Sequence, residues 1–364
     1  DPSSPFFFTS MITALLERQK QRGLWRELQI PSGLIDFASN DYFGFGKMLR
    51  QQNTQIGATG SRLLTGNSSF YEALEQKIAH FHRAESCLIF NSGYIANLGL
   101  ISALGRAEAT FLYDIDIHAS IMDGMRLGKG KNFAFRHNSL DSLEQRLQKN
   151  TPPVFVLIES IYSMTGDLSP IADIAKLCSA YQAHLIVDEA HATGNFGPYG
   201  EGLVCHFNLE SQVFARIHTF SKALGAHGGC VVGSADLKHY LLNYSRPLIY
   251  TTALPPATLD HIAASYEKLR NEAPTKQNLL KKLIASFCKK TGKTPQPSSI
   301  QSIQIGNPHR ARLLSENLKI QGLDVRAMVS PTVGKGKELL RIVLHSFNLE
   351  KEVNLLVEAL QCND

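Results

Sequence analysis

The stretch that decides the fold is HLIVDEAHATG, residues 184–194. It begins with a short apolar run and ends with polar residues, Asp188 and His191 among them. A short apolar run of this kind is consistent with a strand that is buried on both faces of a parallel sheet. Ligands of open α/β sheets bind beyond the carboxyl ends of the strands. The stretch therefore predicts an α/β fold with Asp188 and His191 at a ligand-binding edge.

Other strand-like runs of the same kind lie on both sides of this stretch. They are residues 87–90, 109–113, 133–135, 154–158 and 213–217. Amphipathic stretches separate most of them, and residues 171–181, for example, place apolar side chains at helical spacing. Apolar strands alternating with helices predict a mainly parallel sheet that is covered by helices on both faces.

The pattern changes at Pro255-Pro256. We expect two long helices there, residues 257–272 and 275–290, followed by a turn-rich linker at 291–298. A strand, a helix, two strands and a final helix complete the chain. The predicted organisation is an N-terminal helix and strand segment (1–46), a large domain (47–254) and a smaller α+β domain (255–364).

Composition excludes several classes of protein. The net charge of +5 is small and dispersed, without the basic runs that nucleic-acid binding needs. No apolar run is long enough to span a membrane, and residues 1–10 lack the features of a signal peptide. The six cysteines are scattered without a Cys-x-x-Cys pair, so we expect neither a metal site nor a disulfide framework. Free thiols favour a cytoplasmic location.

A second cluster, VFARIHTFSKALG at residues 213–225, contains a single lysine, Lys222. A lysine that forms a Schiff base must be neutral, which requires burial or a neighbouring cation. Thr219 and Ser221 offer hydroxyl groups to a phosphate. Most lysines are solvated surface residues, but the strand that leads into Lys222 favours a functional role. The cluster indicates a site for pyridoxal 5'-phosphate (PLP).

Asp188 and His191 suit the same cofactor. An aspartate at a strand end can keep the pyridine nitrogen of PLP protonated, so that the ring takes up the charge of a carbanion. His191 is close enough in sequence to reach the phenolic oxygen of that ring. Taken alone, the two residues could instead cap a helix.

Two expected helix starts add to this pattern. The segment Asn91-Ser92-Gly93-Tyr94 follows the strand at 87–90, and a helix N-terminus there would bind an anion such as the cofactor phosphate. His118 precedes another helix and offers an aromatic face to the pyridine ring. The alternative for His118 is an ordinary histidine at a helix start.

The string Val187-Asp188-Glu189-Ala190-His191 also matches the second nucleotide motif of DEAH-type helicases. That function requires an upstream phosphate loop, Gly-x-x-x-x-Gly-Lys-[Ser/Thr]. The chain has only Gly292-Lys293-Thr294, which lies downstream and has Phe287 where the first glycine should be. A nucleotide-dependent enzyme is therefore the weaker alternative.

Together these motifs resemble the α-oxoamine synthases, PLP enzymes of fold type I, over nearly the whole chain from about Met11. Within that family the motifs are most similar to those of the biotin-pathway members. The resemblance rests on the following segments: 39–44 (SNDYFG), 60–66 (GSRLLTG), 92–97 (SGYIAN), 118–120 (HAS), 163–167 (SMTGD), 188–191 (DEAH), 219–225 (TFSKALG) and 330–333 (SPTV).

The resemblance implies a role for each matching residue. Lys222 would carry the cofactor as a Schiff base, Asp188 would pair with its ring nitrogen, His191 would bind its phenolic oxygen and His118 would stack on its ring. The rest of the cofactor site would consist of Gly93, Tyr94, Ser163, Thr219 and Ser221. The substrate contacts would come from Arg26, Asn40, His118, Thr332 and Arg341, with Arg341 on the amino-acid carboxylate.

The implied reaction is the decarboxylative condensation of L-alanine with a pimeloyl thioester, of CoA or acyl carrier protein, to 8-amino-7-oxononanoate. The implied assembly is a homodimer with a large seven-stranded domain, in which the loop 60–66 serves the neighbouring active site. Other members of the family remain alternatives: 2-amino-3-ketobutyrate ligases, 5-aminolevulinate synthases and serine palmitoyltransferases. A homologue that binds PLP without catalysis is a further alternative.

Overall fold

The computed structural model describes residues 17–18, 20–22, 33–45, 57–107, 109–151, 153–294 and 296–362. The chain divides into two compact units, Asp1–Leu34 and Ile35–Asp364. Most of the N-terminal helix and strand segment expected at 1–46 lies outside the described residues. Within it, residues 17–18 and 20–21 are helical, and Lys20 forms an ion pair with Glu17.

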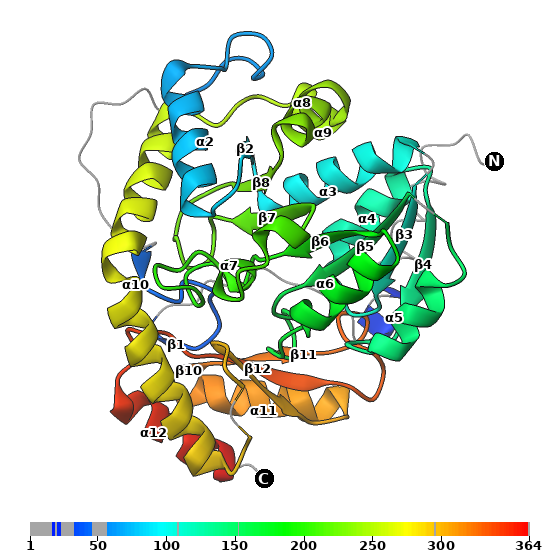
Figure 1. Ribbon diagram of the computed structural model, residues 1–364. Helices are drawn as coiled ribbons and strands as arrows, with labels where there is room; N and C mark the ends of the chain where they lie inside the picture. The colour runs from blue at the N-terminus through cyan, green and yellow to red at the C-terminus, as the bar shows by residue number, and fades with distance from the viewer. Residues whose placement is uncertain are drawn as a thin grey trace, which may run out of the picture. The chain divides into compact units, whose positions relative to one another are not determined.

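The second unit is built on a seven-stranded sheet with the order β2-β8-β7-β6-β5-β3-β4 (Figure 1). Its strands are β2 (Ser86–Phe90), β3 (Thr110–Asp114), β4 (Lys131–Phe135), β5 (Val154–Glu159), β6 (His184–Asp188), β7 (Ala215–Thr219) and β8 (Gly229–Gly233). Every pairing is parallel except those of β8, which runs antiparallel to β2 and β7. The predicted mainly parallel, seven-stranded sheet is confirmed.

Helices cover both faces of this sheet, because successive residues of a strand point to opposite faces. In β5, Phe155 and Leu157 pack into one core while Val154, Val156 and Ile158 pack into another. The helices of the large sheet are α2 (Ser69–Phe81), α3 (Gly93–Leu104), α4 (Ala119–Leu127), α5 (Leu140–Leu147), α6 (Ile171–Ala180), α7 (Leu203–His206), α8 (Ala235–Tyr244) and α9 (Arg246–Ile249).

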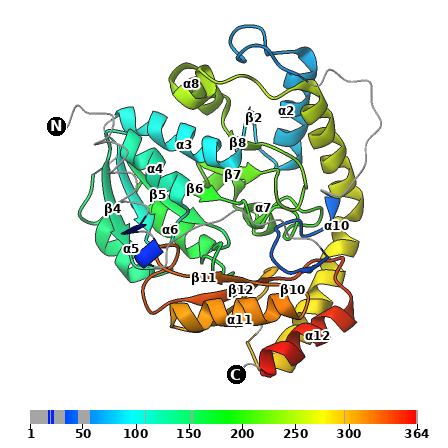
Figure 2. The same cartoon turned by 180° about the vertical axis from the view of Figure 1, so that it is seen from behind.

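A smaller antiparallel sheet, ordered β11-β12-β9, lies below the large one, with α11 and α12 on its outer side (Figures 1 and 2). A parallel pair of short strands, β1 and β10, lies beside it. The bounds are β1 (Ile35–Asp36), β9 (Ile300–Gln304), α11 (Pro308–Ile320), β10 (Leu323–Asp324), β11 (Arg326–Met328), β12 (Leu339–Val343) and α12 (Glu350–Gln361). The predicted domain boundaries at 46/47 and 254/255 stay predictions.

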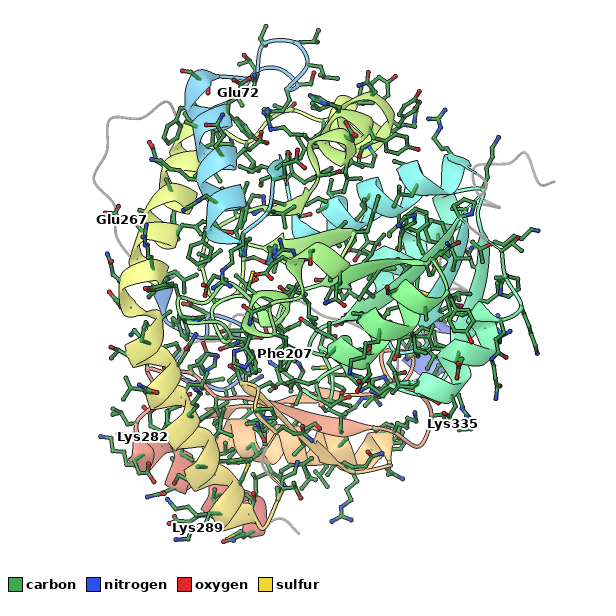
Figure 3. The ribbon with its side chains drawn as sticks, viewed as in Figure 1. Glu72, Phe207, Glu267, Lys282, Lys289 and Lys335 are labelled. Carbon is green, nitrogen blue, oxygen red and sulfur yellow. The ribbon has the colours of Figure 1, made fainter. Side chains whose placement is uncertain are left out.

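One prediction was wrong: the two helices expected at 257–272 and 275–290 form a single helix, α10 (Pro256–Thr291), which runs through Pro274. A proline inside a helix costs about 3 kcal/mol. Tertiary packing offsets this cost, because Leu269 belongs to a core under the large sheet while Phe287 belongs to the core of the small sheet. The outer side of α10 carries Glu267, Lys282 and Lys289 (Figure 3).

Candidate active site

A row of three hydrogen-bonded side chains lies beyond the carboxyl ends of β6 and β7. The Nζ atom of Lys222 is 2.8 Å from Nε2 of His191, and Nδ1 of the same ring is 2.6 Å from the hydroxyl of Tyr42. His191 and Tyr42 are buried. Three distant parts of the chain thus meet at the predicted Schiff-base lysine.

A second row of hydrogen bonds starts at Asp188, the last residue of β6. Its Oδ2 atom accepts from Asn97 Nδ2 at 2.7 Å and its Oδ1 atom accepts from the backbone N–H of Ala190 at 2.9 Å. Asn97 also donates to Ser120 Oγ at 3.0 Å, and Ser120 Oγ lies 2.7 Å from His118 Nδ1. One network therefore orients both the aspartate and the predicted stacking histidine.

The sequence left open that His118 and Asp188 only cap helices, and the structure tests both alternatives. His118 is the N-cap of α4 and accepts from the backbone N–H of Ser120, so it caps a helix and also faces the site. The residues after Asp188 form turns instead of a helix. The interpretation of Asp188 as a helix cap is therefore wrong.

Arg341 reaches the site from β12 of the small sheet. Its Nε atom donates to the carbonyl of Ser163 at 2.6 Å, and its Nη2 atom donates to Asn40 Oδ1 at 3.0 Å. The side chain is buried, and burial lowers the pKa of Arg341. The guanidinium group thus lies in a fixed position where it can bind a carboxylate.

The N-terminus of α3 forms a close-packed cradle with the end of β7. Ser92 caps the helix by accepting from the backbone N–H of Ile95, and a Cβ atom on Gly93 would lie 2.9 Å from Cβ of Thr219. The hydroxyl of Thr219 lies 3.1 Å from that of Ser221. Two hydroxyl groups beside a helix N-terminus, with no side chain between, suit a phosphate group.

The environment of the site makes Lys222 easier to deprotonate than an ordinary lysine. Burial lowers the pKa of Lys222 to about 8, and Arg341 adds to this effect while Asp188 and Glu159 oppose it. Burial and the nearby Lys222 lower the pKa of His191 well below its usual value, so the imidazole is neutral. A neutral amine is the form that attacks a carbonyl group.

Glu159 is a buried carboxyl group at the end of β5, next to Asp188 in the sheet register. Burial, with the charge of Asp188, raises its pKa well above the ordinary value. Its Oε1 atom has no hydrogen-bond partner among the described residues. Its electrostatic influence reaches Lys222, whose pKa it raises.

A charged clamp holds the loop that carries Ser163. His137 lies between Asp114, at 2.9 Å, and Asp167, at 2.7 Å. Burial opposes its charge, but the hydrogen bonds to both carboxylates raise the pKa of His137 to about 10. Ser302 of the small sheet donates to the Thr165 carbonyl at 3.3 Å, so the same loop is fixed from both sheets.

Most of the predicted site residues lie together. The structure gathers the following residues at this edge of the sheet: Asn40, Gly93, Tyr94, His118, Ser163, Asp188, His191, Thr219, Ser221, Lys222 and Arg341. Tyr94 is partly exposed; its ring meets that of His118 edge-on and its hydroxyl bonds to Asp123. Their functional roles stay predictions.

Two further substrate residues were predicted, Arg26 and Thr332. Arg26 lies outside the described residues. Thr332 is exposed in the turn between β11 and β12, where its backbone N–H donates to the Val329 carbonyl. In the described part of the chain no hydrogen bond joins the Thr332 side chain to the Lys222 group.

Four residues of the site were not predicted from the sequence: Tyr42, Asn97, Ser120 and Glu159. The first three lie inside the motifs that suggested the family, SNDYFG, SGYIAN and HAS. Their positions in these motifs were the available signal, but their contacts join segments far apart in the chain. Glu159 ends an apolar strand, as Asp188 does, and that resemblance could have identified it.

The nucleotide-dependent alternative is wrong. Gly292 has a left-handed backbone and ends α10, and its N–H donates to the Cys288 carbonyl. The Gly-Lys-Thr segment thus follows a helix, whereas a phosphate loop leads into one.

Comparisons with known proteins agree with this geometry. The profile of the aminotransferase class I and II family matches residues 32–360, so the chain belongs to this family. A serine palmitoyltransferase solved with PLP as its internal aldimine superposes with a TM-score of 0.86 and 26% identity, covering 99% of this chain and 98% of that one. The fold is therefore that of fold type I PLP enzymes.

The more similar sequences belong to one branch of that class. The 8-amino-7-oxononanoate synthase of Emericella nidulans is 39% identical over 98% of this chain and 96% of the relative. The 8-amino-7-oxononanoate synthase of Francisella tularensis superposes with a TM-score of 0.77 and 27% identity, over 91% of this chain and 96% of that one.

Proposed function

We propose that this chain condenses L-alanine with a pimeloyl thioester, of CoA or acyl carrier protein, to 8-amino-7-oxononanoate, CO2 and the free thiol. The observation that carries the proposal is the meeting of Lys222, Asp188 and Arg341 at one edge of the sheet, in a chain similar to 8-amino-7-oxononanoate synthases over nearly its full length. A PLP-dependent acyltransferase requires together a lysine for the Schiff base, an acid at the ring nitrogen and a cation for the substrate carboxylate.

The residues present fit PLP. The α3 N-terminus with Gly93, Thr219 and Ser221 would hold the phosphate, and Asp188 would hold a proton on the ring nitrogen. When bound, the cofactor supplies an aldehyde that takes up amines and a ring that accepts negative charge. Asn97 keeps the Asp188 carboxylate in place by its 2.7 Å hydrogen bond.

The chain's own residues would select and orient the amino acid. Arg341 and Asn40 form a hydrogen-bonded pair that can receive the substrate carboxylate. His118, fixed by Ser120, would cover one side of the reacting centre. Substrate carbon atoms held between these groups have little freedom, which favours reaction at the α-carbon.

Lys222 would move the proton at the substrate's α-carbon. With its pKa at about 8, roughly a tenth of the amine is neutral at pH 7 and can accept a proton. The resulting ammonium group would then return the proton after CO2 leaves. Asp188 would stabilise the charged form in between, because its charge raises the pKa of Lys222.

The test is thiol release with pure holoenzyme. With pimeloyl-CoA, we expect thiol release to be about tenfold or more faster with L-alanine than with glycine, which lacks the methyl group, or with serine, which adds a hydroxyl group. Faster release with glycine and acetyl-CoA or succinyl-CoA, or with serine and palmitoyl-CoA, would assign the chain to another branch. Bound PLP without thiol release from any pair would identify a non-catalytic homologue.

We propose further that the protein is a homodimer with the active site at the interface. The turn at 61–66 bridges to Thr252, and Asn91, just before the phosphate cradle, donates to the Thr252 carbonyl at 3.0 Å. Beside it Leu64 is 80% exposed and Tyr250 is 72% exposed. Exposed apolar residues next to a site favour burial by a partner.

Sedimentation velocity tests the dimer. We expect wild type to sediment as a dimer, and Leu64→Glu and Tyr250→Glu to shift it toward monomer with loss of activity. Ile320→Glu is the matched control, because Ile320 is 83% exposed on α11, at the small sheet. A monomeric, fully active wild type would contradict the proposal.

We also propose a cytoplasmic location. Five of the six cysteines are buried and all six are free thiols, which suits a reducing compartment. In the described part of the chain, no helix is long and apolar enough to cross a membrane. Fractionation of the native host is the direct test.

A further inference from the structure

The hydroxyl of Tyr42 lies 2.6 Å from Nδ1 of His191, whose Nε2 atom lies 2.8 Å from Lys222 Nζ. Tyr42 is fully buried in the turn after β1, far from the other two residues in sequence. A neutral imidazole carries one N–H group, and the partner of one ring nitrogen decides which nitrogen holds the proton. The direction of the Tyr42 hydrogen bond therefore decides what His191 presents to the lysine.

The contacts indicate that Tyr42 is the donor. A distance of 2.6 Å is usual for an O–H donor but short for an N–H donor. The other acceptor near the hydroxyl, Asn40 Oδ1, is 3.4 Å away and already receives a hydrogen bond from Arg341 at 3.0 Å. Burial raises the pKa of Tyr42, although Arg341 opposes it, so the phenol keeps its proton.

We propose that Tyr42 is a positioning residue that holds His191 in the Nε2–H tautomer. His191 then presents an N–H donor to the Lys222 amine and, when PLP is bound, to the phenolic oxygen of the cofactor. This second part rests on the proposed function, whereas the tautomer itself belongs to the protein alone.

The tautomer also affects the lysine. An N–H donor at Nε2 stabilises a neutral amine, which accepts the hydrogen bond, but repels an ammonium group, which has no lone pair. The other tautomer would accept from the ammonium group and stabilise it. The ionisable neighbours of Lys222, namely Asp188, Glu159 and Arg341, are the same in both cases, so a change in tautomer would be visible as a change in the pKa of the lysine.

The first test uses cofactor-free protein labelled with 15N-histidine. Long-range 1H–15N correlation spectra distinguish protonated from unprotonated ring nitrogens, and the His191→Asn spectrum identifies the His191 signals by difference. At pH 9, above the Lys222 pKa of about 8, we expect wild type to show a protonated Nε2 and an unprotonated Nδ1. A protonated Nδ1 in wild type would overturn the proposal, whatever the behaviour of any variant.

The second test uses Tyr42→Phe, which keeps the ring and removes the donor. We expect a mixture of His191 tautomers and a shift in the pH midpoint of PLP capture upward by about one unit, a tenfold change in the neutral lysine fraction. Tyr266→Phe is the matched control, because Tyr266 is a buried tyrosine whose hydroxyl lies 2.9 Å from His82 Nε2. An unchanged tautomer and midpoint in Tyr42→Phe would overturn the proposal.

These outcomes are separate from those of the proposed function. A wild type that fails to condense alanine with either pimeloyl-CoA or pimeloyl-acyl carrier protein would refute the proposed substrates but leave the tautomer measurement intact. If Tyr42→Phe does not fold, the wild-type spectrum alone decides.

Discussion

Arg341 donates to the carbonyl of Ser163 at 2.6 Å, although the two residues are 178 positions apart. This bond joins a strand of the small sheet to a loop of the large one. The predicted carboxylate-binding group is therefore positioned by the packing of two sheets. A small displacement of either sheet would move the guanidinium group relative to the substrate.

Replacing Arg341 by lysine tests this position. Lysine cannot bond the Ser163 carbonyl and also bind a carboxylate with two parallel hydrogen bonds. We expect the KM for alanine to rise about 10- to 100-fold, the loss of one or two charge-assisted hydrogen bonds, with a smaller effect on kcat. Arg326→Lys is the control, because Arg326 pairs with Arg341 across the hairpin. Equal effects of both variants would contradict a specific role.

Asn97→Leu removes the side-chain donor that holds Asp188. We expect PLP to bind about tenfold more weakly, since one hydrogen bond to a charged group is worth about 1.5 kcal/mol or more. Equilibrium dialysis of PLP measures the effect. Ser120→Ala keeps the Asn97–Asp188 bond and should weaken PLP binding less. A larger loss of PLP affinity in Ser120→Ala than in Asn97→Leu would show that the network acts mainly through His118.

The rate of PLP capture by cofactor-free protein should depend on pH through Lys222. Only the neutral amine reacts, and burial lowers the pKa of Lys222 to about 8. The rate should therefore rise from pH 6 and level off above about pH 9. Stopped-flow absorbance measures it. A rate that still rises tenfold per pH unit at pH 9 would show an ordinary, solvated lysine.

The His137 clamp should make stability depend on pH. The folded-state pKa of about 10 lies above the usual value of 6.5, so its contribution is complete below pH 6.5 and is lost as pH rises toward 10. We expect His137→Asn to lower the free energy of unfolding by about 2 kcal/mol at pH 6 and less at pH 10. The exposed His239→Asn is the control. Parallel pH profiles for wild type and His137→Asn would disprove a charged clamp.

Pro274→Ala should stabilise the protein. It restores a backbone N–H in the middle of α10 at an exposed position and removes a ring clash, for a gain of about 1–3 kcal/mol. Thermal unfolding gives the result, with Asn278→Ala, exposed on the same helix, as the control. A lower melting temperature for Pro274→Ala would mean that the helix depends on a bend at this residue.

The sequence predicted the parts of the fold that depend on local pattern. Buried strands such as β5 are continuous apolar runs, and the start of α3 follows from Ser92. Strand β8 was missed because its GGCVVG segment has glycines at the ends and few residues typical of strands. The predicted helix break near Pro274 was wrong. The packing of Leu269 and Phe287, far from each other along α10, outweighs the tendency of proline to end a helix.

In the candidate site, too, features set by local sequence could be predicted, whereas those set by tertiary contacts could not. Lys222 and Asp188 follow strands, so their position could be predicted. Tyr42 and Asn97 act through contacts with residues more than 90 positions away, and no local pattern encodes such contacts. Thr332 was included by similarity of sequence alone, and the structure leaves it exposed in its turn.

The unbroken course of α10 has a consequence for modularity. Since one helix supplies core residues to both sheets, a cut at residue 254 or 274 would expose apolar surface on each fragment. The two sheets should therefore unfold together in one cooperative step, and the small sheet should not be exchangeable between relatives without the helix. A recombination boundary after Gly292, where the helix ends, keeps α10 whole and attached to the large sheet.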